Sequence, residues 1–151
     1  MGVSLRYATA QPVAVEVRER VKRAANEISR ERDWWAEPIH FFETAWQPGY
    51  LVGNSELFRH GCDWEDDTFL AWRDAQFIVA NLATWASDFE LTWLLSAEGE
   101  IGTVDAKGGD DRVNEFFSRL AALGRHPTSD QHAVEILAAD LLQKYLGRNG
   151  G

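Results

Sequence analysis

The chain has 151 residues, of which 45% are hydrophobic and 26% charged, so it is long enough for one domain with a sizeable core and has neither a disordered nor a fibrous composition. Its formal net charge of −9 disfavours nucleic acid and anionic lipid as partners, because the summed field repels phosphate groups. The single Cys62 excludes an intramolecular disulfide and is typical of a reducing compartment. The N-terminus lacks the pattern of a secretory signal, and no run of about 18 apolar residues occurs, so a cytoplasmic protein that does not span a membrane is predicted.

The aromatic content is high, with seven tryptophans and eight phenylalanines. An aromatic side chain removes roughly 150–250 Å² from water when it is buried, and it therefore dominates the energetics of a core. Most of these rings are predicted to lie inside a single globular domain that spans residues 1–151.

The first two elements are predicted to be a strand and an amphipathic helix. Residues 4–8 precede a proline and contain Tyr7, which is typical of a strand. Pro12 suits the first turn of a helix. The apolar positions that follow are three and four residues apart and form one stripe: Ala14, Val17, Val21, Ala24, Ala25 and Ile28. The charged residues up to Arg30 fall on the other face, where exposed ion pairs contribute only about 0–1 kcal/mol each.

Two strands are predicted next. Residues 39–44 are short and aromatic, and Pro48 and Gly49 bound them. Residues 50–58 form a weaker strand, because Gly53 and the two polar residues after it interrupt the pattern and suggest a bulge or a bend.

The middle of the chain is predicted to organise the rest. Between residues 69 and 86 the only charges are Arg73 and Asp74, so a helix there is apolar nearly all round and must be covered on more than one side. The acidic loop at residues 59–67 is expected to cap this helix through its last two aspartates. Residues 89–95 then alternate in polarity, which predicts a half-buried strand. A turn at residues 98–100 leads into a second strand at residues 101–105.

Two C-terminal helices complete the prediction. Residues 107–109 break the chain, and Asp110 or Asp111 is expected to cap the first of the two helices. The second begins near Thr128, which opens a capping box. Residues 147–151 are expected to fray.

The predicted order of elements is β-α-β-β-α-β-β-α-α, which is an α+β fold with a mostly antiparallel sheet of about five strands covered by helices. The first six elements follow the split βαβ order and so resemble a ferredoxin-like domain, with a hairpin extension and two C-terminal helices added. The sequence contains no internal repeat, low-complexity tract or inter-domain linker.

The densest cluster of potential metal ligands contains His60, Cys62 and Asp63. Imidazole, thiolate and carboxylate are all zinc ligands, and a cysteine beside a cation can be reactive. A structural zinc site usually has a second ligand pair at a defined spacing, however, and no other histidine stands in such a pair. The alternative, an acidic loop that caps the core helix and holds an incidental thiol, is therefore favoured. No metal and no cofactor are predicted.

Two further motifs carry no catalytic chemistry by themselves. His40 and Glu43 stand at an odd separation on a predicted strand, so their side chains point to opposite faces and cannot act as one acid–base pair. Gly108 and Gly109 precede a helix, but the aspartates that follow occupy the place where a phosphate would bind and would repel it.

Four tryptophans lie in predicted loops or at strand ends, where core packing does not obviously require them. They are Trp34, Trp35, Trp46 and Trp64. Tryptophan is enriched in binding hot spots. Two interpretations are open: these rings close the rims of the core, or they form a binding surface together with His40 and Asp63.

The sequence therefore predicts a small acidic cytoplasmic protein that is a non-enzymatic binding or interaction module. It would present the aromatic loop at residues 33–46 and the acidic loop at residues 59–67 to a protein partner. An inhibitor or immunity-type protein for a basic target is one concrete version. The alternative is an enzyme whose pocket uses His40 or the cluster around Cys62, with a metal ion as one option. A homodimer formed through exposed aromatic rings is a third possibility.

Overall fold

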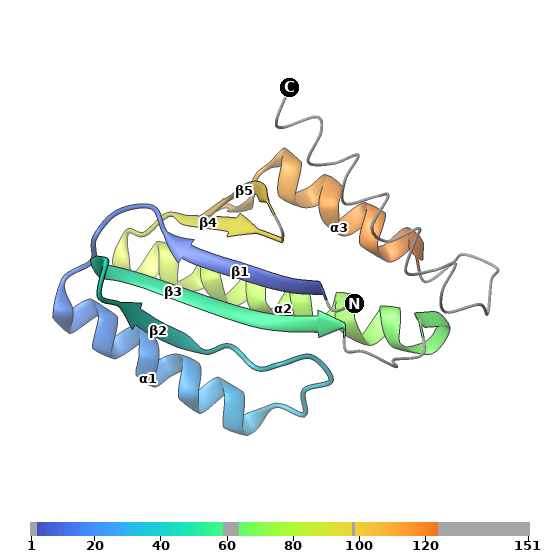
Figure 1. Cartoon of the computed structure of the whole chain (residues 1–151), viewed down its shortest axis with the longest axis horizontal. Helices are drawn as coiled ribbons and strands as arrows, with labels where there is room; N and C mark the ends of the chain where they lie inside the picture. Colours follow the sequence, from blue (N-terminus) through green and yellow to red (C-terminus); the bar gives the residue numbers. More distant parts are fainter. Residues whose placement is uncertain (1–2, 59–63, 98, 124–151) are drawn as a thin grey trace.

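The structure of the chain is a computed structural model, and it describes residues 3–58, 64–97 and 99–123 (Figure 1). Its elements, in chain order, are β1 (Val3–Thr9), α1 (Val15–Glu31), β2 (Phe41–Thr44), β3 (Gln47–Phe58), α2 (Trp64–Phe89), β4 (Trp93–Ser96), β5 (Glu100–Asp105), β6 (Gly108–Gly109) and α3 (Asp111–Leu123). The helix predicted from Thr128 and the frayed end predicted at residues 147–151 lie outside the described residues.

The six strands form one antiparallel sheet in the order β2-β3-β1-β4-β5-β6. The predicted α+β class with an antiparallel sheet is confirmed, but the prediction of about five strands is wrong. The unpredicted strand is β6, whose two glycines pair with Val104 and Asp105 at the point where a chain break was predicted. A strand of two residues shows no alternation of side chains, so periodicity cannot detect it.

The described helices pack against one face of the sheet, and a single core lies between the two layers. Leu5 and Tyr7 of β1 point to this side and are fully buried, together with side chains from all three helices. In Figure 1, which shows the opposite face, α2 passes behind the strands, α1 follows the β2 edge and α3 lies beyond β5. The molecule is thus a two-layer arrangement of helices on a sheet.

Helix α2 is confirmed as the interior element. Its buried side chains recur three and four positions apart from Ala71 to Trp85, and the helix packs on the sheet and on α3 at once. It begins earlier than predicted, at Trp64, so that Asp66 and Asp67 lie inside its first turn instead of preceding it.

Helix α2 also ends later than predicted, and the first half of the strand predicted after it is wrong. Phe89 is the last helical residue, Glu90 has a left-handed φ of 55°, and the Leu91 N–H donates to the Ala86 carbonyl over 3.0 Å. This six-to-one hydrogen bond is the Schellman termination of a helix. β4 therefore starts only at Trp93. Polarity alternates through this turn because Phe89 and Leu91 both pack against the core.

Replacing Glu90 with glycine is expected to raise the free energy of unfolding by about 0.5 kcal/mol. A left-handed conformation costs an L-residue roughly 1–2 kcal/mol, and the greater freedom of unfolded glycine offsets only part of the gain. The midpoint of urea denaturation measures the change. The matched control is Asp88→Gly at an exposed position inside α2, which should cost about 1 kcal/mol. A loss of similar size in both variants would contradict the assigned turn.

Strand β3 is continuous, although the sequence predicted a boundary and an interruption in it. The Pro48-Gly49 pair lies within the strand, because the turn from β2 falls at residues 45–46. Gly53 produces no break in the strand. The ring of Tyr7 on β1 lies directly over it, so that a Cβ atom on Gly53 would be 2.0 Å from Tyr7 Cε2. Glycine is required here by the close approach of a neighbouring ring.

Helix α3 is capped by Asp110, one of the two aspartates predicted for this role. Its Oδ1 accepts a hydrogen bond from the Val113 N–H over 2.9 Å and its Oδ2 accepts one from the Thr103 N–H over 3.1 Å, so the carboxylate joins α3 to β5. Gly102 leaves room for this carboxylate, since a Cβ there would be 2.4 Å from Oδ1. Partial burial raises the pKa of Asp110, but these hydrogen bonds and the Arg112 charge outweigh it and hold the pKa below its usual value.

The Asp110 cap predicts a specific dependence of stability on pH. Because the folded-state pKa lies below the unfolded-state value, the stabilisation is fully present above about pH 4 and is lost as the pH falls through the folded-state pKa. Asp110→Asn keeps a good capping side chain but cannot ionise. Its loss of unfolding free energy relative to the parent chain should be largest at about pH 7 and should shrink towards about pH 2 in urea denaturation. A loss that is constant over this range would contradict the assignment.

Candidate functional site

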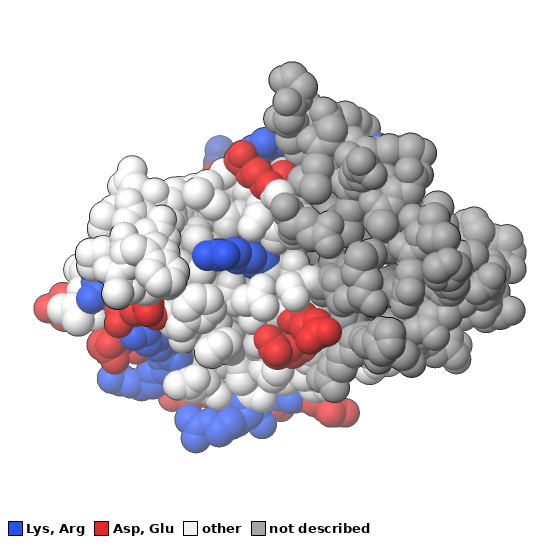
Figure 2. All heavy atoms as spheres, in the orientation of Figure 1, with Lys and Arg blue, Asp and Glu red and all other residues white. Residues whose placement is uncertain are grey.

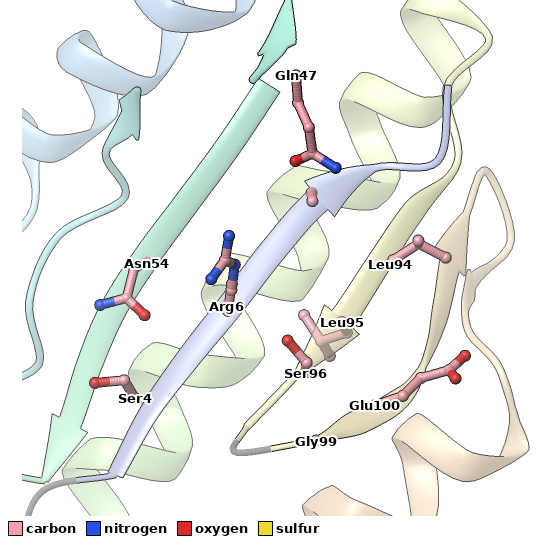
Figure 3. Close-up of a pocket in the computed structure, with 10 residues that line it drawn as sticks. Ser4, Arg6, Gln47, Asn54, Leu94, Leu95, Ser96, Gly99 and Glu100 are labelled. Carbon is pink, nitrogen blue, oxygen red and sulfur yellow. The ribbon is translucent and has the colours of Figure 1, made fainter. Parts of the chain in front are cut away.

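The face of the sheet that the described helices leave uncovered is the candidate site. Side chains alternate along β1, so that Ser4, Arg6 and Ala8 point away from the helices. An open groove of about 770 Å³ runs over this face and is lined by β1, β3, β4 and the start of β5 (Figure 3). This volume lies in the range of roughly 300–1,000 Å³ that is usual for ligand sites. The polar residues that line it are Ser4, Arg6, Gln47, Asn54, Ser96 and Glu100.

A polar row crosses the middle of the groove. Arg6 stands directly opposite Asn54 of β3 and Ser96 of β4, and we call these three residues the polar row. Arg6 is exposed, and within the described part of the chain its side chain forms no ion pair or hydrogen bond. Glu100 lies at the rim and is paired with Arg112 at 3.7 Å. Figure 2, drawn from this side, shows a basic side chain surrounded by uncharged atoms in the middle of the described surface.

An apolar row lies beside the polar row. Ala8, two positions after Arg6, stands opposite Leu94 on one side and Val52 on the other, and Val52 stands opposite Phe42 of β2. These four residues form the apolar row. Its two ends are open to solvent, since Phe42 is 37% exposed and Leu94 is 42% exposed. Side chains two positions apart on a strand are about 7 Å apart, so both rows are within reach of one ligand.

The four candidate tryptophans separate into different environments. Trp46, at the turn between β2 and β3, is 79% exposed and is available for binding. Trp34 and Trp35 are half-buried and pack against the core, with the Trp34 ring 5.5 Å from that of Phe77 on α2. Trp34 and Trp35 therefore fit the first interpretation, in which the rings close the rim of the core. Trp64 opens α2, and its side chain lies outside the described residues.

Asp74 holds the Trp34–Trp35 segment in place, a role that was not predicted from the sequence. Its side chain is 0% exposed, its Oδ2 accepts hydrogen bonds of 2.8 Å from the N–H groups of Trp35 and Ala36, and its Oδ1 pairs with Arg32 at 2.8 Å. The guanidinium of Arg32 in turn lies 4.1 Å from the ring centre of Phe77. The sequence could have indicated this role, because Asp74 is the only acidic residue between residues 69 and 86 of an apolar helix, and a buried carboxylate must be paired.

His40 and Glu43 lie apart and form no acid–base pair. His40 is exposed, precedes β2 and lies beside Phe42, with ring centres 5.7 Å apart. Glu43 points to α1 and pairs with Arg18 at 2.6 Å and with Lys22 at 3.3 Å. The hydrogen bond from Arg18, followed by that from Lys22, lowers the pKa of Glu43. His40 thus lies beside Phe42 at one end of the apolar row, whereas Glu43 anchors the β2–β3 hairpin to α1.

Tyr7 is the described residue with the most perturbed ionisation, and its role is structural. Its hydroxyl lies 2.8 Å from Ser55 Oγ and accepts a hydrogen bond of 3.2 Å from the His40 N–H. Burial raises the pKa of Tyr7 to about 12, against the opposing effect of these hydrogen bonds. The phenol stays protonated at neutral pH and lies on the core side of the sheet, away from the groove. It joins β1, β3 and the chain that enters β2.

The predicted metal cluster is not part of the described site. His60, Cys62 and Asp63 lie outside the described residues. In the described ranges no three His, Cys, Asp or Glu side chains are placed to hold a metal ion. The enzymatic alternative stays a prediction, and metal analysis of the purified protein tests it: stoichiometric zinc that is lost in a Cys62→Ser variant would support it.

Comparison of the chain with protein-family models, with characterised proteins and with solved structures finds no match. Within the described ranges, no helix has both the length and the apolar character needed to cross a membrane. Any functional conclusion therefore depends on the chemistry of the site itself. Among the described residues, that site offers an unpaired guanidinium, neutral hydrogen-bonding groups and exposed apolar side chains, which can bind a ligand but bring no nucleophile next to a base.

Proposed function

We propose that the chain is a non-enzymatic binding module, and that it binds a segment of a protein partner on the face of its sheet that carries the polar and apolar rows. The observation that carries this proposal is the position of Trp46, which is 79% exposed at the hairpin turn, next in the chain to Gln47, a residue that lines the open groove. Tryptophan is one of the residue types that are enriched in interface hot spots. Phe42 and Leu94 extend the apolar contact across the sheet.

This surface replaces part of the one predicted from the sequence. Trp46 and His40 belong to it, whereas Trp34 and Trp35 pack on the core. The net charge of −9 favours a partner that is basic overall, because opposite net charges accelerate association. An inhibitor or immunity-type protein for a basic target is one concrete version, and the single cysteine supports a cytoplasmic location.

We also propose that the fold core is ferredoxin-like. The neighbour order β4-β1-β3-β2 with antiparallel pairing throughout, and two helices placed between the strands along the chain, support this classification. In that description β5, β6 and α3 are additions at one edge. The groove then lies on the face opposite the helices, where both rows are available to a partner.

Site-specific crosslinking tests the function. A photoreactive amino acid placed at Phe42 or Leu94 should crosslink to one discrete partner in the native cell, and the same probe at exposed Glu27 of α1 should not. Trp46→Ala should weaken capture at both positions by about tenfold or more, as expected for a hot-spot residue that contributes about 2 kcal/mol. Equal crosslinking at all three positions would contradict the proposal. Crosslinks only between copies of the chain, with a mass in light scattering that rises with concentration, would assign the face to a homodimer instead.

A further inference from the structure

We infer that the polar row recognises a single side-chain carboxylate, an Asp or Glu within an extended segment of the protein partner. This inference rests on the proposed function and specifies its ligand. The guanidinium of Arg6 would bind the carboxylate, with Asn54 and Ser96 on either side of it.

The position of Arg6 carries the inference. Asn54 and Ser96 are its direct cross-strand neighbours, and such pairs have Cβ atoms about 4.5–5.5 Å apart. An amide and a hydroxyl therefore flank the guanidinium within hydrogen-bond reach of one bound group. Figure 3 shows all three side chains rising from the same face of the sheet. Arg6 forms no ion pair within the described ranges, so its donors are available to a carboxylate, which the planar guanidinium matches in geometry.

The charge balance of the groove favours one carboxylate over a polyanion. Among the described residues that line the groove, Arg6 is the only basic one, and Glu100 at the rim is acidic. A nucleic acid or a phosphorylated segment would bring two or more negative charges to a single guanidinium in a chain with a net charge of −9. A single carboxylate is neutralised by Arg6 alone. The row therefore suits an acidic residue in a partner that can be basic elsewhere.

The backbone of the sheet indicates which kind of carboxylate fits. A C-terminal carboxylate is usually captured by free backbone N–H groups. The N–H groups of β1 lie between two paired strands, β3 and β4, and are used in the ladder. On the described part of β1, the donors that face the groove are therefore side chains, which suits the longer reach of an Asp or Glu side chain.

The apolar row sets a second requirement on the ligand. Ala8 lies two positions after Arg6, so the two rows are about 7 Å apart, which is also the distance between side chains i and i+2 of an extended peptide. A segment that lies along β1 would place its carboxylate on Arg6 and an apolar side chain two positions away on Leu94, which is 42% exposed. The ligand is thus an acidic residue with an apolar residue two positions from it.

Titration with defined peptides, followed by NMR of the 15N-labelled chain, tests the inference. The probe is an acetylated and amidated peptide of sequence Leu-Ser-Glu-Ser-Leu, and its control has glutamine in place of glutamate. The glutamate peptide should shift the Arg6 Nε–H and Asn54 side-chain amide signals and should bind at least about tenfold more tightly than the glutamine peptide, the ratio expected for a charge-assisted hydrogen bond. Higher salt should reduce this ratio.

Matched variants separate the role of Arg6 from the effect of net charge. Arg6→Gln should remove the preference for glutamate, and Arg6→Lys should restore part of it, because lysine keeps the charge and loses the planar fork. Arg23→Gln on α1 changes the net charge by the same amount at an exposed position and should leave the preference intact. A preference that persists in Arg6→Gln, or that disappears in Arg23→Gln, would overturn the inference.

Further outcomes distinguish this inference from the function on which it rests. Stronger shifts with a peptide whose only carboxylate is its C-terminus would assign the row to chain ends and overturn the inference. Shifts of Arg6 on dilution of the protein alone would assign the face to a second copy, with the same consequence. If crosslinking at Phe42 finds a partner while neither peptide shifts the polar row, the proposed function stands and the carboxylate inference is wrong.

Discussion

Asp74→Ala is expected to lower the free energy of unfolding by about 4 kcal/mol, which is the largest effect anticipated for a polar residue in the described part of the chain. Removing the carboxylate leaves the N–H groups of Trp35 and Ala36 buried without an acceptor, at roughly 1–3 kcal/mol each, and also leaves Arg32 without its partner. The segment that contains Trp34 should then detach from α2.

Urea denaturation followed by tryptophan fluorescence measures this loss. Asp88→Ala on the same helix is the matched control, because Asp88 is exposed, and it should change the free energy of unfolding by no more than about 0.5 kcal/mol. Asp74→Asn should fall between the two, since the amide oxygen can still accept a hydrogen bond. Equal stability of Asp74→Ala and Asp88→Ala would show that the carboxylate does not anchor the segment.

Gly53→Ala is expected to cost about 3 kcal/mol, at the upper end of the range for overpacked cores. The new methyl group would lie 2.0 Å from Tyr7 Cε2 and 2.6 Å from the His40 carbonyl oxygen, so either the ring or the backbone must move. Tyr7 cannot move freely, because its hydroxyl is held by Ser55. The substitution should therefore break the buried hydrogen bonds that join β1 to β3.

Thermal and urea denaturation of Gly53→Ala, with Glu56→Ala as the control on the same strand, test this expectation. Glu56 is only partly buried and lies on the opposite face, so its truncation should cost less than about 0.5 kcal/mol. The double variant Gly53→Ala with Tyr7→Ala should lose less unfolding free energy than the two single variants lose in sum, because removing the Tyr7 ring relieves the overlap with the new methyl group. If the two losses of unfolding free energy were additive, overlap with the Tyr7 ring would not be the reason why glycine is required at position 53.

For the elements with a strong local sequence pattern, the predicted type of secondary structure is correct. The interior helix, the amphipathic helix α1 and the aspartate cap of α3 each follow from the spacing or chemistry of nearby residues. Two errors arose where packing against residues from distant parts of the chain produces a misleading local pattern. The ring of Tyr7 on β1 packs over Gly53 within a continuous strand. Phe89 and Leu91 alternate with polar residues as in a strand because both pack against the core from the C-terminal end of α2.

The candidate site was predicted less well than the fold. Trp46 and His40 were named from the sequence: Trp46 is exposed next to Gln47, which lines the groove, and His40 lies beside Phe42. Arg6 was not, because a single arginine between Leu5 and Tyr7 looks like the solvent side of an ordinary strand until its cross-strand neighbours are known. The sequence does show a charge at a central position of a predicted strand, but it does not show which residues of the neighbouring strands lie beside that charge.

The sequence by itself determined the class of this protein: one acidic α+β domain built around an apolar helix, with aromatic rings in excess. Composition and periodicity are properties of neighbouring residues, and burial follows from them because apolar surface must leave water. Only the tertiary structure decided which rings are exposed, which carboxylate is buried, and which side chains stand in one row. The register of the strands places residues that are far apart along the chain beside one another, such as Arg6, Asn54 and Ser96. No local sequence pattern predicts which residues become neighbours in this way.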